Sequence, residues 1–376
     1  MTILHLVQRP QMRGAEIFAA QLANHTRRQG HQVILVSLFP GNIQLPFEGT
    51  TIDLGGKPGH RLWNFTAWRR LAAIIRKEKP DVIQANAGDT LKYAVFSKLL
   101  FRWKQPIIFR NASTISLYIK TWPAKMWNGF LFRHADKIVS VSKTSATDFA
   151  NLYPNCQHKI TVVPIGIEET IVEQQALDTS GNNGHHFPCL VHVGGFTYEK
   201  NHIRLITIFQ DLLHHYPQAR LYLVGDGPLR GDIELIVQQK GLAGSIRFLG
   251  ARKEVMPLIA SADVLLLPSI IEGLPGVILE AFYCKIPVVA YDVGGVGEVL
   301  INNDTGHLVR KGDESGFVAA IRDAIEHKEE DQFMVQNAYQ LVTSGYLNKW
   351  IAKRFIQVYE SVLKRWSNIS SIQNTA

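Results

Sequence analysis

The sequence is poor in cysteine and has no long hydrophobic run. Only three of its 376 residues are cysteines, and Cys156, Cys189 and Cys284 are scattered in or beside apolar segments. This spacing argues against a disulfide framework or a cysteine metal site, and indicates small buried side chains in a reducing compartment. No apolar run reaches the roughly 18–20 residues that a membrane-spanning helix needs, and the first residues lack the basic start of a signal peptide. We therefore expect a cytoplasmic location.

Acidic residues are scarce in the first half of the chain. Residues 1–180 hold 22 Lys or Arg against 12 Asp or Glu, whereas the remainder holds 18 against 20. Between 92 and 143 there are ten basic residues and one acid, Asp136, with aromatic residues interleaved: Phe101, Trp103, Tyr118, Trp122, Trp127, Phe130 and Phe132. Basic and aromatic residues together suit an anionic membrane surface. The alternative is a solvated basic face on structural helices, and without a recognition motif we expect no nucleic-acid partner.

Strand and helix patterns alternate along the chain in two series. Hydrophobic residues make up 46% of the sequence, enough for the cores of two domains of ordinary size. The first series opens with a strand at 2–8, a helix from Arg13-Gly14 and a strand at 31–39. The pattern restarts with strands at 189–193, 220–224, 246–249 and 264–267. Such alternation predicts an α/β fold of two doubly wound domains with parallel sheets and a cleft between them.

Two glutamates flank a turn that follows the strand at 264–267. Pro268 ends the strand, and Glu272 lies in the turn Gly273-Leu274-Pro275-Gly276, where Pro275 suits the first position of a helix. Glu280 then lies about one and a half turns into that helix, whose Leu274, Ile278, Ala281 and Phe282 would face a core. The turn N–H groups and the helix dipole favour an anion, while carboxylates accept hydrogen bonds from sugar hydroxyls. A phosphorylated sugar or nucleotide is indicated; the alternative is an ordinary surface helix.

These residues resemble those of a known family, the retaining glycosyltransferases of family 4. The Glu-x7-Glu spacing of Glu272 and Glu280 is typical of that family. Its other motifs follow in the same order: Pro268-Ser269, Glu272-Gly273, Glu280-Ala281, Pro287-Val-Val-Ala290, and Gly294-Gly295 with Glu298. The resemblance covers nearly the whole chain. It implies the GT-B fold, in which two Rossmann-like domains face a cleft and the last helix crosses back to the first domain.

Domain boundaries follow from this pattern. We expect an acceptor-binding domain at 1–167, a polar linker at 168–187 and a nucleotide-sugar-binding domain at 188–345. The crossover helix is predicted at 346–366. The polar tail at 367–376 is expected to be disordered.

A second loop predicts contacts to the donor diphosphate. Gly194 and Gly195 follow the strand at 189–193, and Lys200 lies at the start of the next helix, so backbone N–H groups and a mobile cation meet at one point. The resemblance implies that Lys200 neutralises the leaving diphosphate. It also implies that Glu272 binds sugar hydroxyls and Glu280 the ribose hydroxyls, with Gly273, Leu274 and Pro275 completing the donor loop. The alternative for Lys200 is a surface lysine at a helix start.

The sequence departs from the family at two positions. The family pattern has an arginine where this chain has Gly195, so one diphosphate cation is missing, and Arg252 or Arg13 are candidates to supply it. Many family members have a histidine that contacts the donor sugar where this chain has Arg110 and Asn111, so no role is carried over there. Gly14, at the start of the first helix, matches a glycine loop that faces the donor phosphates and the acceptor in the family.

The predicted activity is a retaining, metal-independent hexosyl transfer without a cofactor, in surface polysaccharide or lipopolysaccharide biosynthesis. The donor would be a nucleotide-diphosphate sugar and the acceptor a saccharide or a lipid-linked saccharide. A peripheral position on the inner face of the membrane would agree with the basic first domain. The alternative is a catalytically silent subunit that binds a sugar or a partner glycosyltransferase. An epimerase or phosphorylase on the same fold is disfavoured by the Glu-x7-Glu context and by the lack of an identifiable pyridoxal-binding lysine.

Overall fold

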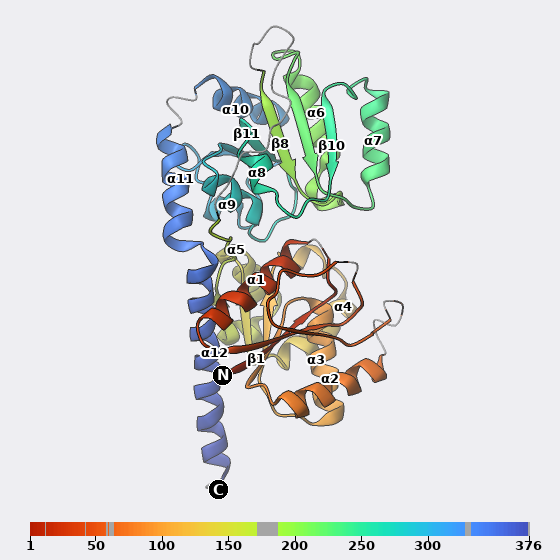
Figure 1. Cartoon of the computed structure of the whole chain (residues 1–376), viewed down its shortest axis with the longest axis vertical. Helices are drawn as coiled ribbons and strands as arrows, with labels where there is room; N and C mark the ends of the chain where they lie inside the picture. The colour runs from red at the N-terminus through yellow and green to blue at the C-terminus, as the bar shows by residue number, and fades with distance from the viewer. Residues whose placement is uncertain are drawn as a thin grey trace. The chain divides into compact units, whose positions relative to one another are not determined.

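The chain folds into two compact units, each built on one parallel sheet (Figure 1). The computed structural model describes residues 1–11, 13–41, 43–57, 59, 64–170, 187–327 and 332–374, with side chains up to 367. The first unit comprises Met1–Glu168 and Asn348–Ala376, and the second Glu169–Leu347. Most of the expected linker lies outside the described residues. The predicted α/β class with two doubly wound parallel sheets is confirmed.

Seven parallel strands form the first sheet, in the order β3-β2-β1-β4-β5-β6-β7. They are β1 (Thr2–Val7), β2 (Gln32–Ser37), β3 (Thr50–Asp53), β4 (Val82–Ala85), β5 (Ile107–Asn111), β6 (Lys137–Ser140) and β7 (Ile160–Val162). The helices of this unit are α1 (Gly14–Arg28), α2 (Phe65–Glu78), α3 (Gly88–Phe101), α4 (Trp122–Arg133), α5 (Lys143–Leu152) and α12 (Asn348–Asn374). The central strands are mostly buried on both faces, as a parallel sheet covered by helices requires.

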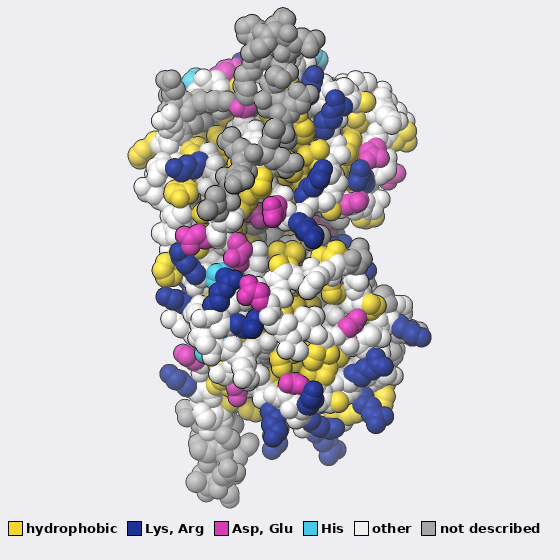
Figure 2. All heavy atoms as spheres, in the orientation of Figure 1, with side chains coloured by type: hydrophobic (Ala, Val, Ile, Leu, Met, Phe, Trp, Pro, Cys, Tyr) yellow, Lys and Arg dark blue, Asp and Glu magenta, His cyan; other side chains and the backbone are white. Residues whose placement is uncertain are grey.

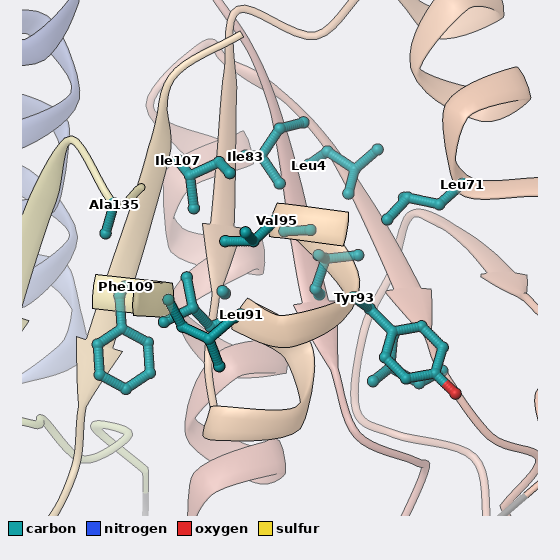
Figure 3. Close-up of a cluster of buried hydrophobic side chains, with 14 of the residues drawn as sticks. Leu4, Leu71, Ile83, Leu91, Tyr93, Val95, Ile107, Phe109 and Ala135 are labelled. Carbon is teal, nitrogen blue, oxygen red and sulfur yellow. The ribbon is translucent and has the colours of Figure 1, made fainter. Parts of the chain in front are cut away.

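Side chains that alternate along β1 build two cores, one on each face of the first sheet. Leu4 and Leu6 join the cluster under α2 and α3, part of which Figure 3 shows around Leu91. Ile3 and Val7 join the opposite cluster with α1 and α12. This alternation with a period of two is what a strand buried on both faces produces.

The last helix, α12, packs against α1 of the first domain, as the crossover helix was expected to do. Ile351, Phe355 and Tyr359 on α12 are fully buried. The helix continues to Asn374, beyond the predicted end at 366, so the expectation of a disordered tail was wrong up to that residue. No glycine or proline interrupts residues 348–374, and nothing in the sequence therefore stops the helix.

Six parallel strands form the second sheet, in the order β10-β9-β8-β11-β12-β13. They are β8 (Cys189–Val193), β9 (Arg220–Val224), β10 (Ile246–Gly250), β11 (Val264–Leu267), β12 (Val288–Tyr291) and β13 (His307–Val309). The helices are α6 (His202–Leu212), α7 (Arg230–Gln239), α8 (Met256–Ile259), α9 (Gly276–Tyr283), α10 (Glu314–Glu326) and α11 (Gln332–Gly345). The strand order reverses between β8 and β11, and open α/β sheets bind ligands at the carboxyl ends of such strands.

The three cysteines are unpaired, and none lies in a reactive setting. Cys156 and Cys189 are buried, whereas Cys284 is half-buried. Burial raises the pKa of the Cys189 and Cys284 thiols to about 12, so both stay protonated at neutral pH. Within the described helices, none is long and apolar enough to cross a membrane.

Candidate functional site

Two loops meet where the second sheet reverses its order. One follows β8 and leads through a short 3-10 turn, η4 (Tyr198–Lys200), into α6, while the other joins β11 to α9. Because β8 and β11 are paired in parallel, both loops leave the same edge of the sheet. The loops are tied together, since Ile270 N donates to Glu199 O at 2.8 Å and the Asn201 side chain donates to Pro268 O at 3.0 Å. These bonds fix the spacing of the two loops before any ligand binds.

Lys200 and Glu272, one from each loop, form an ion pair. The Lys200 Nζ lies 2.6 Å from Glu272 Oε1, and the two side chains are only 22% and 10% exposed. Two residues that the sequence selected independently, 72 positions apart, are thus brought together. The pair places a cation beside a carboxylate at the ligand edge of the sheet, where phosphate and sugar hydroxyl groups of one molecule could be bound at once.

The Gly294-Gly295 motif holds the loop that carries Glu272. Gly294 has a φ of +57°, and a Cβ atom there would overlap the backbone oxygen of Glu272. The next residue, Gly295, donates its N–H to Gly273 O at 2.8 Å. The loop after β12 therefore packs backbone against backbone on the loop after β11, which only a glycine at position 294 permits.

The absence of a side chain at Gly194 leaves room for the aliphatic part of the Lys200 side chain. A Cβ atom at Gly194 would lie 3.1 Å from Lys200 Cδ and 3.0 Å from the His192 ring. At Gly195, in contrast, a Cβ atom would make ordinary contacts, the nearest at 3.5 Å from Asp226 O. Local packing therefore does not forbid a side chain at Gly195. The backbone could carry an arginine at this position, although this chain has glycine there.

The helix α9 begins one residue later than predicted. Pro275 is the residue before the helix, with an extended ψ of 118°, and its carbonyl accepts from Ile278 N. Because proline lacks an N–H group, it suits this capping position as well as the first helical position. Leu274 and Pro275 are buried, and the core face expected for this segment is buried as predicted: Leu274, Ile278, Ala281 and Phe282.

Glu280, on the second turn of α9, is desolvated and unpaired. Its side chain makes no hydrogen bond or ion pair within the described part of the chain. Although the residue keeps some exposed surface, burial raises the pKa of its carboxyl group to about 7. A carboxyl group that lacks donors is free to accept hydrogen bonds from ligand hydroxyls, which is the role predicted for it.

The raised pKa of Glu280 predicts a pH-dependent effect of Glu280→Gln on stability. Between pH 4.5 and 7 the folded wild type binds more protons at this site than the unfolded chain, so its stability falls as pH rises and stays lowered above pH 7. Glutamine carries no charge. The variant should match the wild type near pH 4.5 and exceed it by up to about 3 kcal/mol at pH 8, given about 1.4 kcal/mol per pKa unit. Thermal unfolding at both pH values, with the exposed Glu254→Gln as control, measures this; an equal difference at both pH values would contradict it.

Within the second unit, the structure does not bring Arg252 to Lys200. Arg252 is exposed beyond β10, which β9 separates from β8, and Arg13 precedes α1 in the first domain. A lysine that the sequence did not single out contacts the loop that carries Glu272. Lys311, just after β13, donates its Nζ to the backbone oxygen of Ile270 at 3.2 Å, two residues from Glu272. Its position just after the short strand His307–Val309, at the carboxyl edge of the sheet, is the signal that could have identified it.

Two buried histidines support the Gly194–Lys200 loop and were also missed. The His192 ring donates Nδ1–H to Leu266 O at 2.8 Å, and His202 stacks on Phe196 with ring centroids 4.1 Å apart. Burial lowers the pKa of His192 to about 4 and that of His202 to about 2, so both are neutral. They act as polar packing side chains and leave Lys200 as the cation of this loop.

The remaining predicted residues lie in the first domain. Gly14 is the first residue of α1, with open space around it, and the preceding Arg13 side chain does not cap the helix. Arg110 and Asn111 end β5 and are buried. All three therefore lie at the carboxyl edge of the first sheet, where the sequence placed them.

A cavity of about 260 Å³ in the first domain is unconnected with these loops. Its lining includes Lys137 at the start of β6, so it lies at the amino ends of the strands, away from the ligand edge. Among the described residues, no three His, Cys, Asp or Glu side chains are grouped so that they could hold a metal ion.

Comparison with known families matches both halves of the chain. Residues 12–170 match Glycosyltransferase Family 4, and residues 174–341 match Glycosyl transferases group 1. The second match contains every predicted residue of the donor site from Gly194 to Glu280, and the first contains Gly14 and Arg110.

Curated relatives, several of them named as glycosyltransferases, share 22–37% of their aligned residues with this chain. N-acetyl-alpha-D-glucosaminyl L-malate synthase of Bacillus anthracis is 30% identical over 175 residues, 46% of each chain. Lipopolysaccharide core biosynthesis glycosyltransferase LpsE of Rhizobium meliloti is 25% identical over 77% of this chain and 78% of its own. The chain spans about half the length of the first curated relatives it matches.

Solved structures with the same fold cover nearly the whole chain. Anabaena Alr3699/HepE in complex with UDP-glucose superposes with a TM-score of 0.81 at 21% identity, over 96% of this chain and all of that one. The sucrose-phosphate synthase of Thermosynechococcus elongatus gives 0.83 at 20% identity, over 97% and 99%. At these identities the likeness shows the fold, which is the GT-B fold expected from the sequence.

Proposed function

Because the chain belongs to the GT-B glycosyltransferases of group 1, we propose that it transfers a sugar from a nucleotide-diphosphate sugar with retention of configuration. The single observation that carries this proposal is the Lys200–Glu272 pair at the switch point of the second sheet. The acceptor is a saccharide or a lipid-linked saccharide in surface polysaccharide or lipopolysaccharide synthesis. Relatives named for lipopolysaccharide core biosynthesis and for Vi polysaccharide biosynthesis support it.

The chemistry assigns separate roles to three side chains. Breaking the anomeric bond develops positive charge on the sugar and negative charge on the departing diphosphate. Lys200 and the N–H groups of the loop after Gly194 stabilise the diphosphate. Glu272 binds hydroxyls of the transferred sugar, and Glu280 accepts from the ribose hydroxyls. The reaction proceeds without a metal ion or a cofactor.

A donor-hydrolysis screen tests this function. The wild type is incubated with UDP-, GDP- and ADP-sugars, and release of the nucleoside diphosphate is followed with and without saccharide acceptors. We expect slow hydrolysis of one donor class and a faster reaction with an acceptor. If no nucleoside diphosphate were released from any of the donors, the proposal that the protein is an enzyme would be contradicted.

A silent subunit is the second candidate, and Gly195 is the observation that favours it. The family arginine is absent there, so the diphosphate has one cation fewer on this loop. Lys311, whose Nζ contacts Ile270 O in the loop that carries Glu272, is a candidate replacement. A protein that binds a nucleotide but releases no diphosphate in the same screen would be this subunit.

The first domain presents an apolar and basic surface suited to a lipid-linked acceptor at an anionic membrane. On α4, Trp122 is 73% exposed and Met126 52%, while Phe96 on α3 stacks on Trp127. We call this the α3–α4 surface; its exposed members are Leu99, Leu100, Trp122, Lys125, Met126, Trp127, Phe130 and Arg133. Figure 2 shows Lys and Arg beside hydrophobic side chains over the lower part of the first domain, where Figure 1 draws α2 and α3. We propose a peripheral position on the inner face of the membrane.

Vesicle sedimentation checks the α3–α4 surface. Replacing Lys125 and Arg133 of this surface and the exposed Lys120, which lies just before α4, by serine should weaken binding to anionic phosphatidylglycerol vesicles by about 100-fold at low salt, at roughly 1 kcal/mol per cation. Trp122→Ala should weaken binding as well, whereas Phe333→Ala, an exposed aromatic of the second domain, should not. Equal binding of the wild type to neutral and anionic vesicles would contradict the membrane assignment.

A further inference from the structure

Arg110 is a buried cation without a hydrogen-bond partner. It lies at the carboxyl end of β5 and is 3% exposed. Its Nε and Nη1 atoms are sealed from solvent and have no partner among the described residues. The guanidinium lies 4.4 Å from the centre of the Phe18 ring, which contributes attraction but accepts no conventional hydrogen bond. A guanidinium carries five N–H donors, and burying them unpaired is unfavourable.

The other buried polar side chains around Arg110 largely satisfy one another. The Tyr359 hydroxyl donates to Gln84 Oε1 at 2.6 Å, and the Gln84 amide donates to Asn86 Oδ1 at 2.9 Å. His5 lies in the same cluster, and burial together with the Arg110 charge lowers its pKa to about 3. A neutral histidine supplies no negative charge. This network therefore does not balance Arg110.

Glu16 is an acid whose charge acts on Arg110, but the two side chains are not ion-paired. No ion pair within 4.0 Å joins Glu16 to Arg110 among the described residues. Glu16 accepts from the Gln11 side chain through Oε1 at 2.9 Å, while its Oε2 is buried without a partner. The Arg110 guanidinium and Glu16 Oε2 are thus a buried donor group and a buried acceptor atom in one region, and both lack hydrogen-bond partners among the described residues. A ligand with an anionic group and hydroxyls would satisfy both once the side chains that cover these atoms move aside.

The first turn of α1 lies beside the same region. Phe18, which stacks on Arg110, and Glu16 both belong to α1, whose first residue is Gly14. The Arg13 side chain does not cap the helix, and nothing lies within contact distance of a Cβ atom at Gly14. A helix start of this kind favours an anion. It therefore adds to the field of Arg110 at the ligand edge of the first sheet.

We propose that Arg110, with the first turn of α1, binds a carboxylate or phosphate group of the acceptor. The guanidinium donates to the anion, and Glu16 accepts from a neighbouring hydroxyl of the same sugar. That this ligand is the acceptor rests on the proposed glycosyl transfer, in which the second domain binds the donor. The anion site itself does not depend on it. The acceptor is accordingly an acidic saccharide, such as a uronic acid or a sugar phosphate, rather than a neutral one.

Calorimetric titration of the full chain tests this site. The ligands are D-glucuronate for the carboxylate, D-glucose 1-phosphate for the phosphate and D-glucose as the neutral reference. The wild type should bind one of the two anions at least 10-fold more tightly than glucose, because only the anion accepts charged hydrogen bonds from the guanidinium. Arg110→Met should remove this preference. Arg69→Met, which removes an exposed arginine of the same domain, should keep it.

Two further variants separate this site from the donor site and from a structural role. Lys200→Ala should lose nucleotide affinity and keep the anion preference, whereas Arg110→Met should do the reverse. Arg110→Lys should retain part of the preference, since it keeps the charge without the planar group. Thermal unfolding of Arg110→Met should occur at or above the wild-type temperature, because a buried unpaired charge is removed. A wild type that binds neither anion better than glucose, or an Arg110→Met variant that keeps the preference or melts several degrees lower, would overturn the proposal.

Discussion

Lys200→Ala is expected to lower the turnover of sugar transfer by about 100-fold or more. Removing one charged donor that stabilises the transition state typically costs about 3–4 kcal/mol, and each 1.4 kcal/mol is a factor of ten. Lys200 is the cation of the loop after β8, and its Nζ is fixed 2.6 Å from Glu272 at the ligand edge of the sheet. The measurement is kcat on the donor that the hydrolysis screen identifies.

Two controls accompany this variant. Lys240→Ala removes an exposed lysine of the same domain, whose Nζ contacts Gln210, and should leave kcat unchanged. Thermal unfolding of Lys200→Ala separates a chemical effect from misfolding, because the variant leaves Glu272 without its cation. A folded Lys200→Ala enzyme with near-normal kcat would show that another group stabilises the diphosphate.

Gly294→Ala is expected to lower both stability and turnover. Alanine at a φ of +57° costs about 1–2 kcal/mol, and its Cβ overlaps the backbone oxygen of Glu272, so that loop must shift at about 1–3 kcal/mol more. A displacement of about 1 Å at a catalytic group can reduce the rate by about 100-fold. Thermal unfolding and kcat measure the two effects.

Gly312→Ala is the matched control for this glycine. Gly312 also has a positive φ, +85°, but nothing lies within 4 Å of a Cβ atom there. The control therefore bears the backbone strain without the overlap, and the difference between the variants reports the contact with Glu272. If both variants lost stability equally and Gly294→Ala kept its turnover, the loop after β12 would not position Glu272.

The fold was predictable because its signals are local and repeat. β8, β9 and β11 have the predicted bounds, since each is a short apolar run followed by a turn. Ser142 caps α5 with its side chain, which accepts from Ser145 N at 3.1 Å, as the preference for serine at a helix start predicts. The length of α12 was underestimated, because a polar composition predicts disorder whereas the chain there contains no residue that breaks a helix.

Part of the candidate site was predictable from the sequence. Residues in loops with glycine and proline signals could be predicted, whereas residues placed only by tertiary contacts could not. Lys200 and Glu272 lie in loops with strong glycine and proline signals, and parallel pairing of their strands brings them together. Lys311 contacts the same loop through a backbone oxygen, which no spacing in the sequence encodes. Arg110 has no hydrogen-bond partner because no acceptor in the described part of the chain lies within hydrogen-bonding distance of its buried atoms. The sequence does not encode these distances, so this feature could not be predicted from it. Catalytic roles for all of these residues stay predictions.

Nucleotide binding tests the central claim most directly. Wild type and Lys200→Ala are titrated with UDP, GDP and ADP while thermal unfolding is followed. We predict a dose-dependent rise in the unfolding temperature with one of the three nucleotides, and a clearly smaller rise in the variant, because the diphosphate loses its cation. No rise with any nucleotide at millimolar concentration, or an equal rise in both proteins, would contradict a donor diphosphate site at Lys200.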